Sequence, residues 1–110
     1  MWYLTFSRPA VPREQIAPHL QEHLDWQRRM HESGRVLFSG PSGDRTMGII
    51  LVRASSLEDA HDLLDTEPFH ARGLRTYEVI EWDVHQGLGL GGFSGESLAL
   101  LAREKDETSA

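Results

Sequence analysis

Apolar residues recur along the chain with two different spacings, and these spacings predict strands alternating with helices. Trp2 to Ser7 (WYLTFS) is rich in aromatic and β-favouring residues, which predicts an N-terminal strand. Short apolar runs at Arg35 to Ser39 and Met47 to Arg53 predict two further strands, joined as a hairpin around residues 40 to 46. Partial alternation from Leu74 to Val84 predicts a fourth strand.

A first helix is expected between the first two strands. Glu14 to Ser33 has helical periodicity, with its regular part beginning near Pro18 and ending at Gly34. At ~100° per residue, one stripe of this helix is expected to be buried, with three further residues at its margins. The stripe consists of Ile16, Leu20, His23, Gln27 and Met30, and the margins of His19, Leu24 and Trp26.

A second helix is expected after the third strand. Ser55-Ser56, with acidic residues nearby, is a typical helix start, and Pro68 marks the end of this helix at the latest. Its apolar stripe consists of Leu57, Ala60, Leu63 and Leu64.

The resulting order, βαββαβ, predicts an α+β fold of the ferredoxin-like type, an antiparallel sheet with two helices on one face. The other sheet face has little polar surface to expose, so a homodimer paired through the sheet faces is expected. We assign residues 1–85 to this domain. Residues 86–110 begin with a glycine-rich stretch (QGLGLGGFSG) and are expected to form an arm and a C-terminal tail.

Composition narrows the classes of partner. The 110 residues carry 17 acidic and 11 basic side chains, a net charge of -6, which argues against a nucleic-acid-binding surface. No run of ~18 apolar residues occurs, so no membrane span is expected. The absence of cysteine excludes disulfides and thiolate chemistry and suits a cytoplasmic protein. A small molecule is therefore the expected ligand.

His23 is the first candidate for chemistry because it occupies an apolar stripe. A buried imidazole needs a hydrogen-bond partner, and histidine exchanges protons near neutral pH. The competing interpretation is a core histidine bonded to a backbone carbonyl. His19 lies four residues before His23, but no third ligand is evident, so no metal site is expected. The other histidines considered, His61, His70 and His85, are expected at the surface.

Three stretches, taken in order and spacing, resemble a known family. They are His23-Leu24 eleven residues ahead of Gly34, the run GRVLFSGP from Gly34 to Pro41, and Glu67-Pro68-Phe69 followed by Gly73-Leu74. With them, the chain from about Trp2 to Asp83 resembles the YCII-related (YciI-like) family of small dimeric α+β barrel proteins.

The resemblance implies a ferredoxin-like fold, dimerisation through the sheets, and a pocket where a first-helix histidine approaches an aspartate in an Asp-Pro-Phe turn. The corresponding residues are His23 and Glu67, with glutamate in place of aspartate. The extra methylene moves the carboxylate by ~1.5 Å, and catalytic geometry is sensitive to such a shift. Asp65 is the alternative acidic partner. The carboxylate would orient the imidazole and stabilise its protonated form.

The substrate-binding residues are predicted to be Tyr3, Trp26, Phe38 and Phe69, whose rings would line a pocket for a flat molecule, although aromatic residues at such positions more often serve core packing. Gly40 and Pro41 would let a ligand approach the backbone, or form only a turn.

We therefore predict a small enzyme, without a cofactor, that performs histidine acid/base chemistry on an aromatic or enol-like molecule. Lyase, dehydrochlorinase and isomerase reactions fit this equipment and are among those that the family resemblance implies. The alternative is a non-catalytic dimeric module that binds a small molecule or accompanies a partner protein.

Overall fold

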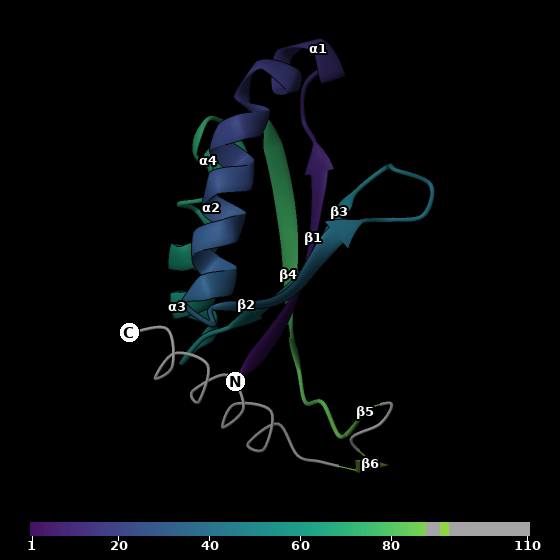
Figure 1. The fold of residues 1–110 in the computed structure, drawn as a ribbon, viewed down its shortest axis with the longest axis vertical. Coiled ribbons are helices and arrows are strands. Elements are labelled where there is room, and N and C mark those ends of the chain that lie inside the picture. Colours follow the sequence, from purple (N-terminus) through teal and green to yellow (C-terminus); the bar gives the residue numbers. More distant parts are fainter. Residues whose placement is uncertain (88–90, 93–110) are drawn as a thin grey trace.

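Four antiparallel strands form the central sheet in the order β2-β3-β1-β4 (Figure 1). The computed structural model describes residues 1–87 and 91–92. The strands are β1 (Trp2–Pro9), β2 (Val36–Pro41), β3 (Gly48–Arg53) and β4 (Arg75–Trp82). A separate pair consists of β5 (Gln86–Gly87) and β6 (Gly91–Gly92).

The helices are α1 (Arg13–Ile16), the 3-10 turn η1 (Ala17–His19), α2 (Leu20–Glu32), α3 (Leu57–Leu64) and α4 (Pro68–Ala71). The helices α2, α3 and α4 lie on one side of the sheet, and α1 lies beyond the end of β1 (Figure 1). Within the described part of the chain, no helix is long and apolar enough to cross a membrane. The order of the main elements and the strand order confirm the predicted α+β, ferredoxin-like βαββαβ fold.

Three signals in the sequence explain where the elements begin and end. Ser56 caps α3, its side chain accepting the amide of Asp59, as the serine pair predicted. Gly34 follows α2 with a φ of 77°, a left-handed conformation that glycine adopts without strain. Pro18 falls in η1 rather than in α2, so the regular helix begins two residues later than predicted.

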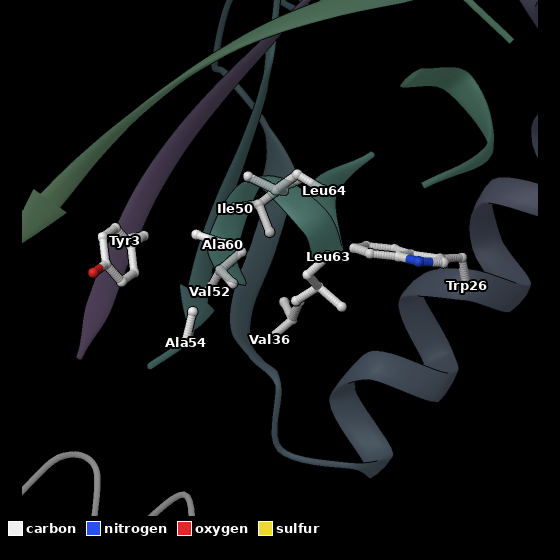
Figure 2. Packing of buried hydrophobic residues seen from close by; sticks show 9 residues of the cluster. All are labelled: Tyr3, Trp26, Val36, Ile50, Val52, Ala54, Ala60, Leu63 and Leu64. Carbon is white, nitrogen blue, oxygen red and sulfur yellow. The ribbon is translucent and has the colours of Figure 1, made fainter. Parts of the chain in front are cut away.

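The main core lies between the helices and the sheet (Figure 2). Its buried residues are Tyr3, Trp26, Val36, Ile50, Val52, Ala54, Ala60, Leu63 and Leu64. Of the buried stripe predicted for the first helix, Ile16 is buried and Met30 packs against the core, but Leu20 is half exposed. Of the residues predicted at its margins, Leu24 is half exposed, whereas Trp26 is 2% exposed. The indole of Trp26 also donates a hydrogen bond to Thr66 Oγ1 at 3.0 Å. This rotation of α2 places His23 at the edge of the core, next to solvent.

The opposite face of the sheet is apolar. Alternation along the strands directs Trp2 and Leu51 to this face, where they pack with Val84 and Leu37. Phe38 pairs with Leu51 and Trp82 with Trp2, which places both rings on the same face. Pairing with a second copy remains a prediction. Most of the predicted arm and tail, residues 86–110, lies outside the described residues.

Candidate functional site

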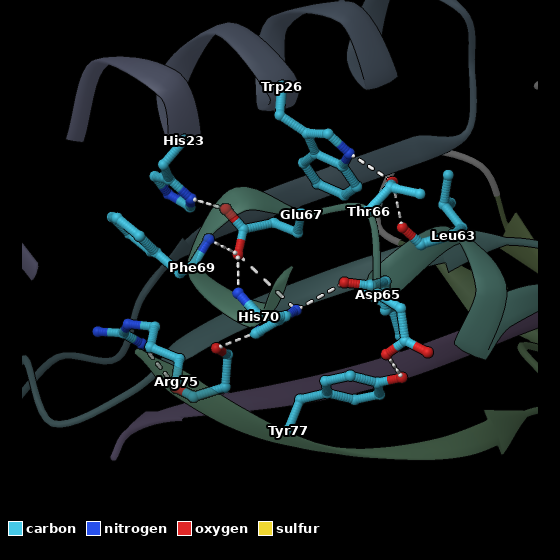
Figure 3. Close-up of polar contacts among 12 residues, drawn as sticks. His23, Trp26, Leu63, Asp65, Thr66, Glu67, Phe69, His70, Arg75 and Tyr77 are labelled. Atoms are coloured by element: carbon cyan, nitrogen blue, oxygen red, sulfur yellow. Dashed lines mark hydrogen bonds and ion pairs between the residues drawn. The ribbon is translucent and has the colours of Figure 1, made fainter. Parts of the chain in front are cut away.

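His23 and Glu67 form the centre of the candidate site (Figure 3). His23 Nδ1 lies 2.6 Å from Glu67 Oε1, a short contact between side chains 44 residues apart in sequence. His23 is the fourth residue of α2, and Glu67 is the residue immediately before α4. The His23 side chain is 22% exposed and that of Glu67 is 1% exposed. The pair therefore combines a buried carboxylate with an imidazole that solvent reaches.

The backbone of α4 fixes the carboxylate. Glu67 is the N-cap residue of this helix, and its Oε2 accepts the amides of Phe69 at 3.1 Å and His70 at 3.3 Å. Pro68 occupies the first helical position, where its missing N–H costs nothing. Since one oxygen is held by the helix, the other remains directed at His23.

The orientation of the His23 ring follows from its neighbours. A carboxylate only accepts hydrogen bonds, so His23 Nδ1 must carry a hydrogen and donate the hydrogen bond to Glu67 Oε1. The ring stacks on Phe69, with centroids 4.3 Å apart and planes inclined by 10°. Nε2 is left with a lone pair, and the Gln27 amide nitrogen lies 3.4 Å from it. With Nδ1 as the donor to Glu67, Nε2 is the ring nitrogen at which a proton could be accepted.

His70 is buried beneath this pair, contrary to the prediction that it lies at the surface. Its side chain is 3% exposed. Nδ1 donates to the Leu64 carbonyl at 2.8 Å, which leaves Nε2 to accept from Ser7 Oγ at 2.7 Å. Burial lowers the pKa of His70, although Leu64 and Glu67 act in the opposite direction. With both nitrogens engaged, His70 anchors α4 to β1 rather than meeting a substrate.

The alternative acidic partner, Asp65, is directed elsewhere. Its Oδ1 accepts the Tyr77 hydroxyl at 2.8 Å. Burial, reinforced by this hydrogen bond, raises the pKa of Tyr77 well above its usual range. Geometry therefore brings Glu67, not Asp65, to His23.

Of the predicted substrate-binding rings, Phe69 joins His23 directly. Trp26 lies three residues after His23 but is packed in the core. Tyr3 is 1% exposed and lies at the other end of the same core, as Figure 2 shows. Phe38 is 69% exposed, but strand alternation directs it to the sheet face away from the helices. Within one chain, Tyr3 and Phe38 are therefore not brought to His23.

Gly40 and Pro41 end β2 and are both exposed. A side chain at Gly40 would meet nothing within 4 Å. Their predicted contact with a ligand stays a prediction.

Gln27 and Ser39 are site residues that the sequence analysis missed. Gln27 lies one helical turn after His23, and Ser39 on β2 donates to its side-chain oxygen. A polar side chain on the predicted apolar stripe was the one available signal. In residues 1–87 and 91–92, no group of three or more metal-ligating side chains is placed to hold an ion.

Comparison with known proteins supports the fold. Protein YjpA of Bacillus subtilis (strain 168), which is uncharacterized, is 32% identical over 79 residues, covering 72% of this chain and 88% of that protein. Among solved structures, 5-chloro-2-hydroxyhydroquinone dehydrochlorinase (TftG) from Burkholderia phenoliruptrix AC1100, in complex with 2,5-dihydroxybenzoquinone, has a similar fold. That similarity has a TM-score of 0.61 at 20% identity and covers 74% of this chain and 93% of the dehydrochlorinase. The YCII-related domain model matches residues 1–83, and the chain therefore belongs to the YCII-related domain family.

Proposed function

We propose that this protein is a small enzyme in which His23 exchanges a proton with an aromatic or enol-like substrate. The observation that carries the proposal is the 2.6 Å contact between Nδ1 of the partly exposed His23 and the buried Glu67. A carboxylate on one imidazole nitrogen fixes the tautomer and stabilises the positive charge that develops when the other nitrogen takes a proton. A histidine oriented in this way can act as a general base.

The proton would be taken by His23 Nε2 and the resulting imidazolium stabilised by Glu67. In a dehydrochlorination of a chlorinated hydroquinone, one hydroxyl proton first moves to the ring carbon that bears chlorine, and a C=O forms. His23 Nε2 then takes a second hydroxyl proton, the electrons of that O–H bond form another C=O and a new ring C=C, and chloride leaves with the C–Cl pair, so HCl is lost overall. In an isomerisation, the same imidazolium returns the proton at a different carbon. Both reactions use one base, and the choice between them depends on the substrate.

Two features favour a flat substrate. Phe69 and His23 already stack as parallel rings, and a further planar molecule can extend such a stack. The structural neighbour is a dehydrochlorinase of a chlorinated hydroxyhydroquinone. A substituted hydroquinone or a related enol is therefore the substrate class that we propose.

The test measures chloride release from 5-chloro-2-hydroxyhydroquinone by the full-length protein. His23→Gln should lower kcat/KM by about 100-fold or more, the usual contribution of a general base, and Glu67→Gln should also lower it. His85→Gln is the matched control, since His85 is exposed and pairs only with Asp83 among the contacts described. Equal turnover by His23→Gln and the unchanged protein would contradict the proposal.

The same experiment addresses the alternative of a binding module. If 2,5-dihydroxybenzoquinone binds with a dependence on His23 while no chlorinated or enolic substrate is turned over, the site serves for binding alone. Isothermal titration calorimetry with both variants provides that measurement.

A further inference from the structure

A chain of polar side chains continues from His23 away from Glu67. Gln27 Nε2 lies 3.4 Å from His23 Nε2, Gln27 Oε1 accepts from Ser39 Oγ, and Ser39 Oγ lies 2.8 Å from His31 Nε2. His23, Gln27 and His31 recur every four residues along α2 and so share one side of that helix. Ser39 faces them from β2, because its cross-strand neighbour Ile50 belongs to the core beneath the helices.

The direction of each hydrogen bond in this chain can be derived. The lone pair on His23 Nε2 requires a donor, and the Gln27 amide nitrogen supplies one. The Gln27 oxygen then accepts the Ser39 hydroxyl proton. That hydroxyl has a single proton, so Ser39 Oγ must accept from His31 Nε2–H. Each group from His31 to His23 donates to the next, and the Glu67 carboxylate accepts at the end of the chain.

We propose that Gln27 is a positioning residue for the proton transfer and that Ser39 sets its orientation. An amide side chain can present either its NH₂ or its oxygen to His23, and the choice decides the state of the base. With the NH₂ group inward, Nε2 keeps its lone pair. With the oxygen inward, Nε2 would be held as N–H and could not accept a proton. Ser39 selects the first arrangement by occupying the amide oxygen.

The contact of Gln27 with His23 is also one that a substrate can replace. At 3.4 Å it is longer than a typical N–H···N hydrogen bond, whereas the Glu67 contact on the other nitrogen is short. The weaker partner is the one that an approaching acidic proton would displace, after which the amide remains beside the substrate as a donor. This inference rests on the function proposed above.

The test is the nitrogen NMR spectrum of the His23 imidazole in the full-length protein at pH 7.5, recorded without substrate. We expect a protonated Nδ1 and an unprotonated Nε2. Gln27→Glu places an acceptor at the lone pair and should yield a doubly protonated ring at the same pH, because a carboxylate stabilises the imidazolium. Ser39→Ala should move the Nε2 signal in the same direction, and Ser39→Thr, which keeps the hydroxyl, should restore it.

Turnover provides the second measurement. Gln27→Met should lower kcat about three- to tenfold, the effect of one lost neutral hydrogen bond, with KM less affected. Gln27→Glu should lower kcat about 100-fold at neutral pH, with activity recovering as pH rises. Gln21→Met is the matched control, because Gln21 lies on the same helix and bonds only to the exposed Asp25 among the contacts described.

The inference is overturned if His23 Nε2 carries the proton in the unchanged protein, or if Ser39→Ala alters neither the spectrum nor kcat. Failure of the proposed function has a different signature. The imidazole spectra would then change with the Gln27 and Ser39 substitutions as expected while no substrate is turned over. That result would support the positioning role of Gln27 and contradict only the proposed catalysis.

Discussion

Glu67 performs two tasks with its two carboxylate oxygens. One oxygen caps α4, and the other accepts the hydrogen bond from His23 Nδ1. The resemblance raised the concern that glutamate in place of aspartate would spoil the distance to the histidine. Instead, the longer glutamate side chain reaches from the cap position of α4 to the imidazole, so glutamate at this position still makes the contact with His23.

The two tasks are separable by substitution. Glu67→Asp keeps a good N-cap residue, so the free energy of unfolding should change by less than about 1 kcal/mol while turnover falls. Glu67→Ala removes the cap and leaves the buried Phe69 amide without a partner, which should cost about 2 kcal/mol in addition to turnover. Urea unfolding monitored by circular dichroism checks both values. Glu58→Ala, at an exposed site, is the control, and equal stability of the alanine and aspartate variants would refute the capping role.

His70 predicts a pH dependence of stability. Burial holds the pKa of His70 in the folded chain below its ordinary value of 6.5, so the unfolded chain binds more protons between those two values. The free energy of unfolding should therefore be highest above pH 6.5 and fall as the pH is lowered from there. Thermal unfolding of the protein and of His70→Gln across pH 5 to 8 measures the difference. The variant should show a shallower decrease, and identical slopes would contradict the assignment.

Only part of the site could be predicted from the residues themselves. His23 stood out because it interrupts an apolar pattern on one helix. Its link to Glu67 spans 44 residues and leaves no local periodicity, so only the family resemblance suggested it. Gln27 stood out only as a polar residue on the predicted apolar stripe, Ser39 not at all, and their relation appears only when β2 is packed against α2.

At the scale of elements, the strands and helices were predicted well because each has a strong local signal. Period-two alternation defines β4, and Gly34 and Ser56 mark helix boundaries by backbone conformation and capping. The buried face of α2 was predicted less well. Leu20 lies on the first turn of α2, where it is half exposed, while Trp26, predicted at the margin of the stripe, is the most deeply buried residue of that helix.

Gly34 is expected to be the glycine on which the α2–β2 connection depends. Its φ of 77° costs a residue with a Cβ about 1 kcal/mol, so Gly34→Ala should destabilise the fold by about that amount. Gly43→Ala is the matched control, because no positive φ occurs there and a Cβ would meet nothing within 4 Å. Chemical denaturation compares the two variants, and equal stabilities would show that the turn tolerates a side chain.

At the scale of the whole molecule, the sheet face opposite the helices governs assembly. Phe38, Ile80 and Trp82 are 69%, 54% and 45% exposed in the single chain, a large apolar area for a protein surface. A second copy with the same face would cover it, and we expect a homodimer on that basis.

Ile80→Glu should convert this dimer to a monomer, because it places a charge within the apolar face. Sedimentation equilibrium measures the mass. Leu57→Glu is the matched control, since Leu57 is 49% exposed at the start of α3, on the helical side, and should leave the mass unchanged. A monomeric unchanged protein would exclude assembly through this face.

The division of the site between the two halves of the fold has a consequence for how the protein acquires its chemistry. His23 belongs to the half before the β2–β3 hairpin and Glu67 to the half after it. A chain cut between Ser42 and Met47 would leave each fragment with one member of the pair. Recovery of the proposed proton-transfer activity on mixing would then report reassembly of the sheet, because the imidazole–carboxylate contact forms only when both halves pack together.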